Sequence, residues 1–330
     1  MPAEVMEHHN MLRKVSRTFA LSIELLPYIL RESITLSYLL LRVSDCLEDN
    51  EQIPVEEKPE LLRLWANVLN GSAPVDALST RIAYLAPSDD PEVQTALRAG
   101  EYLVLLKNLP DDLQKIIINR VQQTSLGMAR WQAHGPFVED ETAMDDYMHQ
   151  VAGLVGYLLT EIFAWYSPRV KKRIDQLMPL AREYGLALQT VNIIRGIRKD
   201  YERGWVYVPQ SLYEHYGLTR EGLFAPENVD KAMLVINNLA EKASSHLMKG
   251  ISYIMAFPRH QHRIRLACMW PLFFAIKTLA VSKNNVNVIV SEAKLTREQV
   301  MKIIRDTSWF GWSNHWLNRY YEQLSQPEME

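Results

Sequence analysis

Apolar residues recur at steps of three and four along nearly the whole chain, which is the pattern of amphipathic α-helices. The pattern runs through residues 32–49, 60–69, 93–106, 111–128, 145–165, 170–199, 229–257, 261–281 and 297–324. Turn-forming residues such as Asn70-Gly71-Ser72 and Gly135-Pro136 separate these segments. No useful length of the chain alternates with the period of two that a strand requires. We therefore predict a single all-α domain over residues 1–330.

Two of the predicted segments, 34–47 and 151–163, are apolar on nearly every face, which is typical of helices in the centre of a large bundle. Gly153 and Gly156 weaken the second helix by about 1 kcal/mol each relative to alanine. Two interpretations of these glycines stay open: close packing of another helix, or a bulky ligand lying against the backbone. Near the end of the chain, Thr296 and Gln299 form a capping-box pattern that begins the last predicted helix.

The composition is that of an ordinary globular protein, with 48% hydrophobic and 23% charged residues. A net charge of −3 gives no electrostatic signature of nucleic-acid binding. The two cysteines, Cys46 and Cys268, are too few for a disulfide framework or a zinc quartet and indicate a reducing compartment. The N-terminus lacks a signal-peptide pattern, and the longest apolar run, 266–276, is too short to span a bilayer. We expect a cytoplasmic protein and leave peripheral membrane contact and oligomeric state open.

Candidate chemistry begins with Asp45 and Asp49, which are four residues apart at the end of the first long apolar helix. This spacing places both carboxylates on one face, and the apolar sequence before them predicts that the face looks inward. Carboxylates that approach one another need a cation, and Mg²⁺ is commonly held by one or two carboxylates together with substrate phosphates. The alternative is a helix end with solvated acids.

A second polar stripe lies in segment 170–199 and the residues just after it. Its members fall on one face at steps of three and four residues: Gln189, Asn192, Gly196 and Asp200. Buried amides and carboxylates need partners, because each unpaired polar group costs about 1–3 kcal/mol. Nearby cations are suited to phosphate oxygens: Arg195, Arg198, Lys199 and Arg203. The alternative is a solvated basic helix end.

Four blocks of this sequence together resemble the squalene/phytoene synthase family. They are Ser-Arg-Thr-Phe-Ala at 16–20, Leu-Arg-Val-Ser-Asp-Cys-Leu-Glu-Asp at 41–49, the Tyr…Gly-Leu-Val-Gly pattern at 147–156, and the Gln…Asn…Asp…Arg-Gly…Tyr-Val-Pro pattern at 189–209. The blocks occur in the family's order across about residues 11–325. Residues 265–279 also resemble the late helix of bacterial farnesyl-diphosphate farnesyltransferase-like members.

The resemblance implies an isoprenoid-synthase-type helical bundle around a central cavity, with two acidic helices facing each other. It implies that Mg²⁺, or Mn²⁺ in its place, bridges the acids to a prenyl diphosphate and promotes ionisation of that substrate. A second prenyl diphosphate then attacks head to head, which gives a cyclopropylcarbinyl diphosphate and from it a linear hydrocarbon. Squalene-forming relatives also need NADPH, and no dinucleotide motif in this chain decides its use.

The resemblance also assigns roles to individual positions. Tyr147 matches a tyrosine close to the reacting carbons and would be catalytic together with Asp45 and Asp49. Positions that match metal ligands are Asp45, Asp49, Asn192 and Asp200. Positions that match diphosphate contacts are Arg17, Arg42, Arg195, Lys199, Arg203 and Tyr207. Further positions that would line the cavity are Ser16, Phe19, Gly153, Gly156, Gln189 and Gly196.

The chain departs from the family pattern at Gly196, where the second motif normally carries an aspartate. Lys199 also stands where eukaryotic members have an acid. Three hypotheses therefore stay open. The chain couples two farnesyl-type diphosphates head to head, or it passes one ionised prenyl group to another acceptor or cyclises it, or it is a non-catalytic lipid- or partner-binding member. The sequence gives neither the prenyl chain length nor the product.

Overall fold

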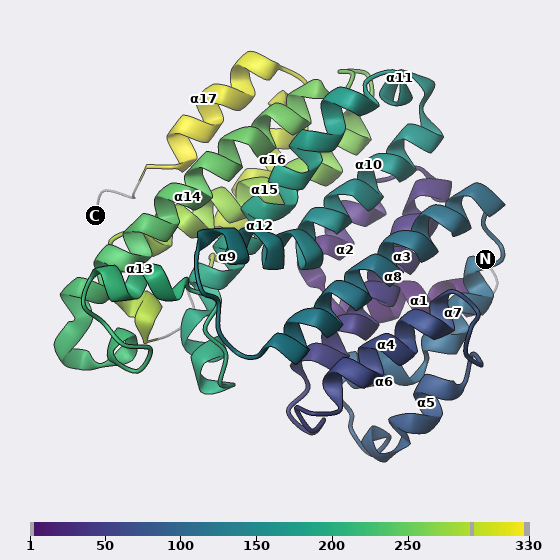
Figure 1. Ribbon diagram of the computed structural model, residues 1–330. Helices are drawn as coiled ribbons and strands as arrows, with labels where there is room; N and C mark the ends of the chain where they lie inside the picture. Colours follow the sequence, from purple (N-terminus) through teal and green to yellow (C-terminus); the bar gives the residue numbers. More distant parts are fainter. Residues whose placement is uncertain (1–2, 291–293, 327–330) are drawn as a thin grey trace. The chain divides into compact units, whose positions relative to one another are not determined.

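The computed structural model describes residues 3–290 and 294–326, without the side chains of residues 3–6 and of Arg17. Every regular element of this described part is helical, and Val138 and Pro209 form one isolated parallel bridge. The all-α prediction is therefore confirmed. The chain groups into two compact units, Met1–Gly135 with Tyr157–Ile174, and Pro136–Gly156 with Asp175–Glu330 (Figure 1). A single domain over residues 1–330 stays a prediction.

The first unit is built around α3. Its elements are α1 (Ala3–Val15), α2 (Arg17–Glu24), α3 (Tyr28–Asp49), α4 (Lys58–Leu69), α5 (Ala77–Arg81), η1 (Ala83–Leu85), α6 (Pro91–Leu97), α7 (Ala99–Leu106), α8 (Asp111–His134), most of α10 (Leu154–Tyr166) and α11 (Pro168–Lys171). Helix α3 packs against α1, α2, α4, α6, α7 and α8, and α4 packs along α8 (Figure 1). The helix that ends in the acidic motif is thus the central element of its unit.

Helix α3 buries leucines on several faces and satisfies its polar groups internally. Leu36, Leu39 and Leu40 are at most 2% exposed. Ser37 donates to the carbonyl of Ser33 at 2.7 Å, which lets a hydroxyl sit in this apolar helix without an unpaired donor. The helix ends at Asp49, where the sequence pattern also ends it.

The second unit contains α9 (Glu141–Met148), the π-helix η2 (His149–Gly153), the first residues of α10, α12 (Ile174–Glu202), α13 (Gln210–His215), η3 (Gly222–Phe224), η4 (Pro226–Asn228), α14 (Val229–Ala256), α15 (His262–Ser282), η5 (Val286–Ile289), α16 (Arg297–Phe310) and α17 (Asn314–Leu324). Helix α15 packs against α14, α16 and α17. It is therefore the core helix of this unit.

Helix α15 is the one described helix that is long and apolar enough to cross a membrane by length and composition, and 83% of its apolar window is buried inside the protein. The apolar run 266–276 looked too short to span a bilayer because Arg265 and Lys277 bound it. Both of these charged residues are buried in the helix, at 0% and 7% exposed. The helix is thus longer than the run, and its burial is that of a core helix.

Four predicted segments do not form one continuous α-helix: 93–106, 145–165, 170–199 and 297–324. Segment 297–324 forms α16 and α17, because the chain turns after Phe310 and Ser313 caps a new helix by accepting from the backbone N–H of Trp316 at 3.3 Å. Segment 93–106 forms α6 and α7, which are separated by the non-helical backbone of Arg98. The capping box of Thr296 and Gln299 is present as predicted.

The glycines of segment 151–163 allow close helix packing. A Cβ on Gly156 would lie 2.8 Å from the carbonyl carbon of Ala181, and one on Gly185 would lie 2.6 Å from the carbonyl carbon of Ala152. Since real Cβ atoms do not approach backbone so closely, η2 and the start of α10 touch helix α12 backbone to backbone. This favours the packing interpretation of Gly156 over a ligand lying against it.

Candidate active site

The last turns of α3 place a cation among acids. The guanidinium of Arg42 lies 3.3 Å from a carboxylate oxygen of Asp45 and 3.2 Å from one of Glu92, which begins α6. A second nitrogen of Arg42 donates to the hydroxyl of Tyr38 at 2.6 Å. Burial opposes the charge of Arg42, but Asp45, Tyr38 and Glu92 raise its pKa above the ordinary value. Arg42 is therefore held as a permanent cation.

One donor of Arg42 is not used by the protein. Its Nε is buried and has no hydrogen-bond partner among the described residues. A buried donor without a partner costs about 1–3 kcal/mol, so it is an indication of a missing acceptor. An anionic oxygen of a ligand would satisfy it.

The acidic pair is less buried than the sequence predicts. The side chain of Asp45 is 32% exposed, and Asp49 is exposed. The prediction that this face looks inward holds for half-buried Asp45 but not for exposed Asp49, because apolar periodicity shows which faces are buried but not whether a neighbour covers the polar one. Burial of the carboxylate nevertheless raises the pKa of Asp45 to about 6. The cation of Arg42 opposes this rise, and the negative charges of Asp49 and Glu92 add to it.

This donor set fits a divalent metal ion. Asp45 and Asp49 present carboxylate oxygens from one helix face, which are the ligands that hard cations such as Mg²⁺ prefer. The pKa of Asp45 is raised mainly because burial makes the ionised carboxylate costly, and a bound cation would offset that cost.

The sequence analysis did not place two members of this cluster, Glu92 and Tyr38, beside Arg42. Glu92 is 50 residues from Arg42 along the chain, and no spacing rule relates the two. Tyr38 precedes Arg42 by one helical turn, so the i,i+4 rule could have paired them.

The Ser-Arg-Thr-Phe block begins α2 in the same unit. Ser16 caps this helix by accepting from the backbone N–H of Phe19 at 3.2 Å. The ring of Phe19 lies 5.6 Å from that of Tyr38, centroid to centroid, so α2 contacts the Arg42 cluster through these rings. Arg17 is the first residue of α2, and its side chain lies outside the described part.

The second motif lies at the end of α12 in the other unit. Arg203 donates to Asp200 at 2.5 Å, and both side chains are largely buried. A Cβ on Gly196 would meet only a carboxylate oxygen of Asp200, at an ordinary contact distance of 3.6 Å. Gly196 and Asp200 therefore share a face, as their spacing predicts, and there is room for a side chain at 196. The other candidates on this helix range from half-buried to exposed: Gln189 and Arg195 are half-buried, and Asn192 and Lys199 are exposed.

The chain turns back after α12 and stacks three aromatic rings. Gly204 adopts a positive φ of 83°, and the N–H of Trp205 donates to the carbonyl of Asp200 at 2.8 Å. The rings of Tyr147 and Tyr207 stack with centroids 4.5 Å apart, and Trp205 lies against Tyr207 at 5.4 Å. Tyr147, Tyr207 and the end of the second motif thus belong to one local arrangement.

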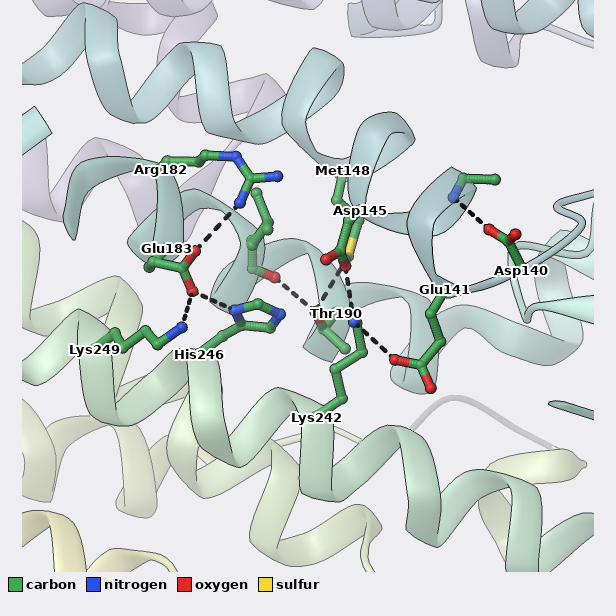
Figure 2. A network of polar contacts seen from close by, with 12 residues as sticks. Asp140, Glu141, Asp145, Met148, Arg182, Glu183, Thr190, Lys242, His246 and Lys249 are labelled. Atoms are coloured by element: carbon green, nitrogen blue, oxygen red, sulfur yellow. Dashed lines mark hydrogen bonds and ion pairs between the residues drawn. The ribbon is translucent and has the colours of Figure 1, made fainter. Parts of the chain in front are cut away.

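Polar contacts fix α9, the helix that carries Tyr147. Lys242 of α14 pairs with Asp145 at 2.8 Å and with Glu141 at 3.2 Å, as Figure 2 shows. The hydroxyl oxygen of Thr190 in α12 donates to the carbonyl of Leu186 at 2.7 Å and lies 3.2 Å from the sulfur of Met148. Immediately after α9 the chain forms the π-helix η2, and such irregular turns are frequent at functional sites.

Each unit therefore brings together one group of the predicted residues. Ser16, Phe19, Arg42, Asp45 and Asp49 lie in the first unit. The second unit holds the other group, Tyr147, Gly153, Gly156, Gln189, Asn192, Arg195, Gly196, Lys199, Asp200, Arg203 and Tyr207.

Comparisons with known proteins all point to one family. The model of the squalene/phytoene synthase family matches residues 12–299. Human squalene synthase is 30% identical over 304 residues, which cover 91% of this chain and 69% of the human protein. A solved complex of TcSQS with a ligand has a TM-score of 0.84 at 24% identity and covers 97% of this chain and 91% of that one. A solved dehydrosqualene synthase has a TM-score of 0.62 at 17% identity, with 93% and 95% covered.

Proposed function

The chain belongs to the squalene/phytoene synthase family, whose members are prenyltransferases, and from this membership we propose that it is a Mg²⁺-dependent enzyme that couples two farnesyl-type diphosphates head to head. The proposed product is presqualene diphosphate followed by squalene, or a dehydrosqualene-like hydrocarbon. The observation that carries the proposal is the Arg42 cluster, in which an unused buried donor adjoins a partly solvated carboxylate pair. The Arg42 cluster and the adjoining carboxylates therefore suit an anionic ligand that binds together with a cation.

Family membership implies dependence on a divalent metal ion, and the oxygen donors of Asp45 and Asp49 favour Mg²⁺, with Mn²⁺ as its closest substitute. When bound, such an ion draws electron density from the diphosphate and makes it a better leaving group. Arg42 would then donate hydrogen bonds to the diphosphate oxygens as negative charge collects on them. Its contacts with Tyr38 and Glu92 hold the guanidinium in place before the substrate arrives.

In the second unit we assign Asp200 and Asn192 to metal binding and Arg195, Lys199, Arg203 and Tyr207 to the diphosphate. Arg203 already has a carboxylate partner in Asp200, so its charge is neutralised until an anion competes for it. Tyr147 would present a ring face or its hydroxyl to the reacting carbons, while Tyr207 covers its other face. An electron-rich ring face can stabilise a carbocation without acting as a nucleophile.

The metal assignment is tested by incubating the Asp45→Asn variant or the Asp49→Asn variant with Mg²⁺ and labelled farnesyl diphosphate. Each variant should lose diphosphate release by at least about 100-fold, since even partners of metal ligands are worth about 10- to 100-fold. The double variant should be little worse than either single one, because ligands of one ion act as a unit. Extraction and mass analysis measure the hydrocarbon, and a phosphate assay measures the leaving group.

Asp112→Asn is the matched control, because Asp112 is an exposed helical aspartate of the same unit at the beginning of α8. It should turn over like the wild type. Normal turnover in both single variants at Asp45 and Asp49 would refute the metal assignment. A product that contains only one prenyl group would refute head-to-head coupling and leave the metal assignment standing.

The same incubation tests whether the reaction uses NADPH. Comparing the extract with and without NADPH decides between a reduced squalene-type product and a dehydrosqualene-type product, because only the first requires a hydride. A cytoplasmic location stays a prediction from the sequence, which leaves peripheral membrane contact and the oligomeric state open.

A further inference from the structure

A cluster of metal-binding side chains lies outside both acidic motifs. His8 and His9 on α1 meet Glu32 on α3, within the first unit. The Nε2 of His8 lies 3.0 Å from one carboxylate oxygen of Glu32, and the Nε2 of His9 lies 2.7 Å from the other. Each oxygen of a single carboxylate therefore meets one imidazole.

The convergence of the two rings is specific. Neighbouring residues on a helix point about 100° apart, so two consecutive side chains do not ordinarily reach the same group. Here the ring centroids of His8 and His9 lie 4.4 Å apart, and both rings lean toward Glu32. The site is also shielded, because the His8 and Glu32 side chains are 3% and 8% exposed and that of His9 is 13% exposed.

The three side chains offer a suitable donor set. One nitrogen from each imidazole and one carboxylate oxygen lie within 4.8 Å of one another. Ligands bound at about 2.1 Å to a tetrahedral ion lie about 3.4 Å apart, so small rotations of the side chains would admit one. Two histidines and a glutamate, with a water in the fourth position, are a ligand set known for Zn²⁺.

We propose that His8, His9 and Glu32 form a Zn²⁺ site that fastens α1 to α3. Two imidazole nitrogens select Zn²⁺ over Mg²⁺, whereas the oxygen-only pair of Asp45 and Asp49 selects the reverse. Arg31 does not occupy the position, because its Nε is 3.7 Å from Glu32 and its guanidinium lies over the ring of Tyr28.

The site is distinct from the diphosphate chemistry. Glu32 precedes Asp45 by 13 residues on the same helix, which corresponds to about 20 Å along its axis. The role of the ion is to hold the N-terminal helix on the central helix of the unit. The alternative is a hydrogen-bonded trio without an ion, in which His8 and His9 merely satisfy a buried carboxylate.

Metal analysis distinguishes a Zn²⁺ site from a hydrogen-bonded trio without an ion. The full chain with Asp45→Asn and Asp49→Asn, which removes those carboxylates as competing ligands, is stripped with a chelator and incubated with equimolar Zn²⁺ in excess Mg²⁺. After gel filtration it should retain about one Zn²⁺ per chain, and Zn²⁺ should raise Tm by about 5 °C. Replacement by Co²⁺ should give the visible absorption of a low-coordinate N/O site.

Variants assign the ligands. Glu32→Gln keeps the shape of the side chain but replaces one acceptor oxygen with an amide donor and is a poor ligand, and His9→Ala alters the most exposed of the three residues. Each should reduce Zn²⁺ retention at least about 10-fold and abolish the rise in Tm. If His9→Ala fails to fold, Zn²⁺ retention by the Glu32→Gln variant alone still shows whether this cluster binds the ion.

The control is Glu183→Gln, which alters the carboxylate paired with His246 at 2.7 Å. There a lysine, Lys249, takes the place of a second histidine, so that cluster cannot bind Zn²⁺ in the same way. This control should retain Zn²⁺ like its parent. A parent chain that retains no Zn²⁺, or a Glu32→Gln variant that retains as much as its parent, overturns the proposal.

Discussion

Gly196 removes a carboxylate from the second motif and leaves a space in its place. The position a Cβ would occupy has a single neighbour within 4 Å, the carboxylate of Asp200 at 3.6 Å. Asp200 thus has no second acid at 196 with which to share a cation. The family aspartate would fit this position without displacing the backbone.

Gly196→Asp should therefore raise the apparent affinity for Mg²⁺ about 3- to 10-fold, since affinity for hard cations grows with the number of charged ligands. Coupling activity at limiting Mg²⁺ should stay intact or rise. In the absence of metal the variant should be less stable than Gly196→Asn, because two carboxylates then repel each other. Titrating activity against Mg²⁺ and measuring Tm with and without it check both expectations.

Gly196→Asn is the matched control, equal in shape and without the charge, and it should not increase Mg²⁺ affinity. An aspartate variant with unchanged rate, metal dependence and product would mean that position 196 does not serve the cation.

At the scale of elements, two helices of the second unit, α12 and α14, are tied together by polar contacts around the largely buried carboxylate of Glu183 (Figure 2). Glu183 of α12 accepts from His246 and Lys249 of α14 at 2.7 and 3.0 Å and from its neighbour Arg182 at 3.2 Å. The hydrogen bond from His246 lowers the pKa of Glu183 to about 2, although burial opposes this, and Lys249 adds to the lowering. The tie between α12 and α14 therefore depends on an ionised Glu183.

A carboxyl group whose pKa is lower in the folded protein stabilises the fold above its unfolded pKa, near 4.5 here, and loses that contribution as pH falls toward 2. Glu183→Gln should thus reduce stability by about 2 kcal/mol at pH 7, and the difference from wild type should vanish between about pH 4.5 and 2. Thermal unfolding across this range measures it. Glu241→Gln, an exposed change on α14, should show no such pH dependence. If the difference in stability between wild type and Glu183→Gln were the same at every pH, the shape of the Glu183 side chain and not its charge would hold α12 to α14.

Sequence patterns located most helices because their signal is local, as at α3, whose end coincides with the last predicted residue, Asp49. They failed where a break needs only a short turn, as between α16 and α17, since apolar spacing continues across it. Spacing alone located the acids of the candidate site, Asp45, Asp49 and Asp200, and the family resemblance added the roles of positions such as Arg17 and Tyr147. The Arg42–Glu92 contact joins elements 50 residues apart, and periodicity within one helix carries no information on such pairs.

At the scale of the whole molecule, the buried guanidinium of Arg265 joins several helices of the second unit by hydrogen bonds. Arg265 of α15 is 0% exposed and donates to the carbonyls of Ile254 and Phe257 at 3.1 Å. It also donates to the carbonyl of Gly311 at 3.2 Å and to the amide oxygen of Asn314 at 2.7 Å. Burial lowers the pKa of Arg265 to about 10, and its positive charge is met by these oxygens at the ends of α14 and α16 and the beginning of α17.

Arg265→Leu should destabilise the protein by about 3 kcal/mol, because it leaves several buried acceptors without a donor. Tm should then fall by about 5–10 °C. Arg263→Leu, an exposed change on the same helix, should shift Tm by little. Calorimetry of both variants measures the difference, and equal melting temperatures would mean that Arg265 contributes only apolar packing.

The backbone contact at Gly156 limits how this sequence can evolve. The carbonyl group of Ala181 in α12 occupies the place of any side chain at 156, so even a single added methyl group would force these two backbone segments apart. Most positions tolerate a chemically conservative substitution, and related sequences ordinarily diverge through such single substitutions. No step of that kind exists at 156: the smallest change is already too large, and only a coordinated shift of both helices could follow it. Descendants of this chain are therefore held to glycine there by geometry alone, whatever hydrocarbon they come to make.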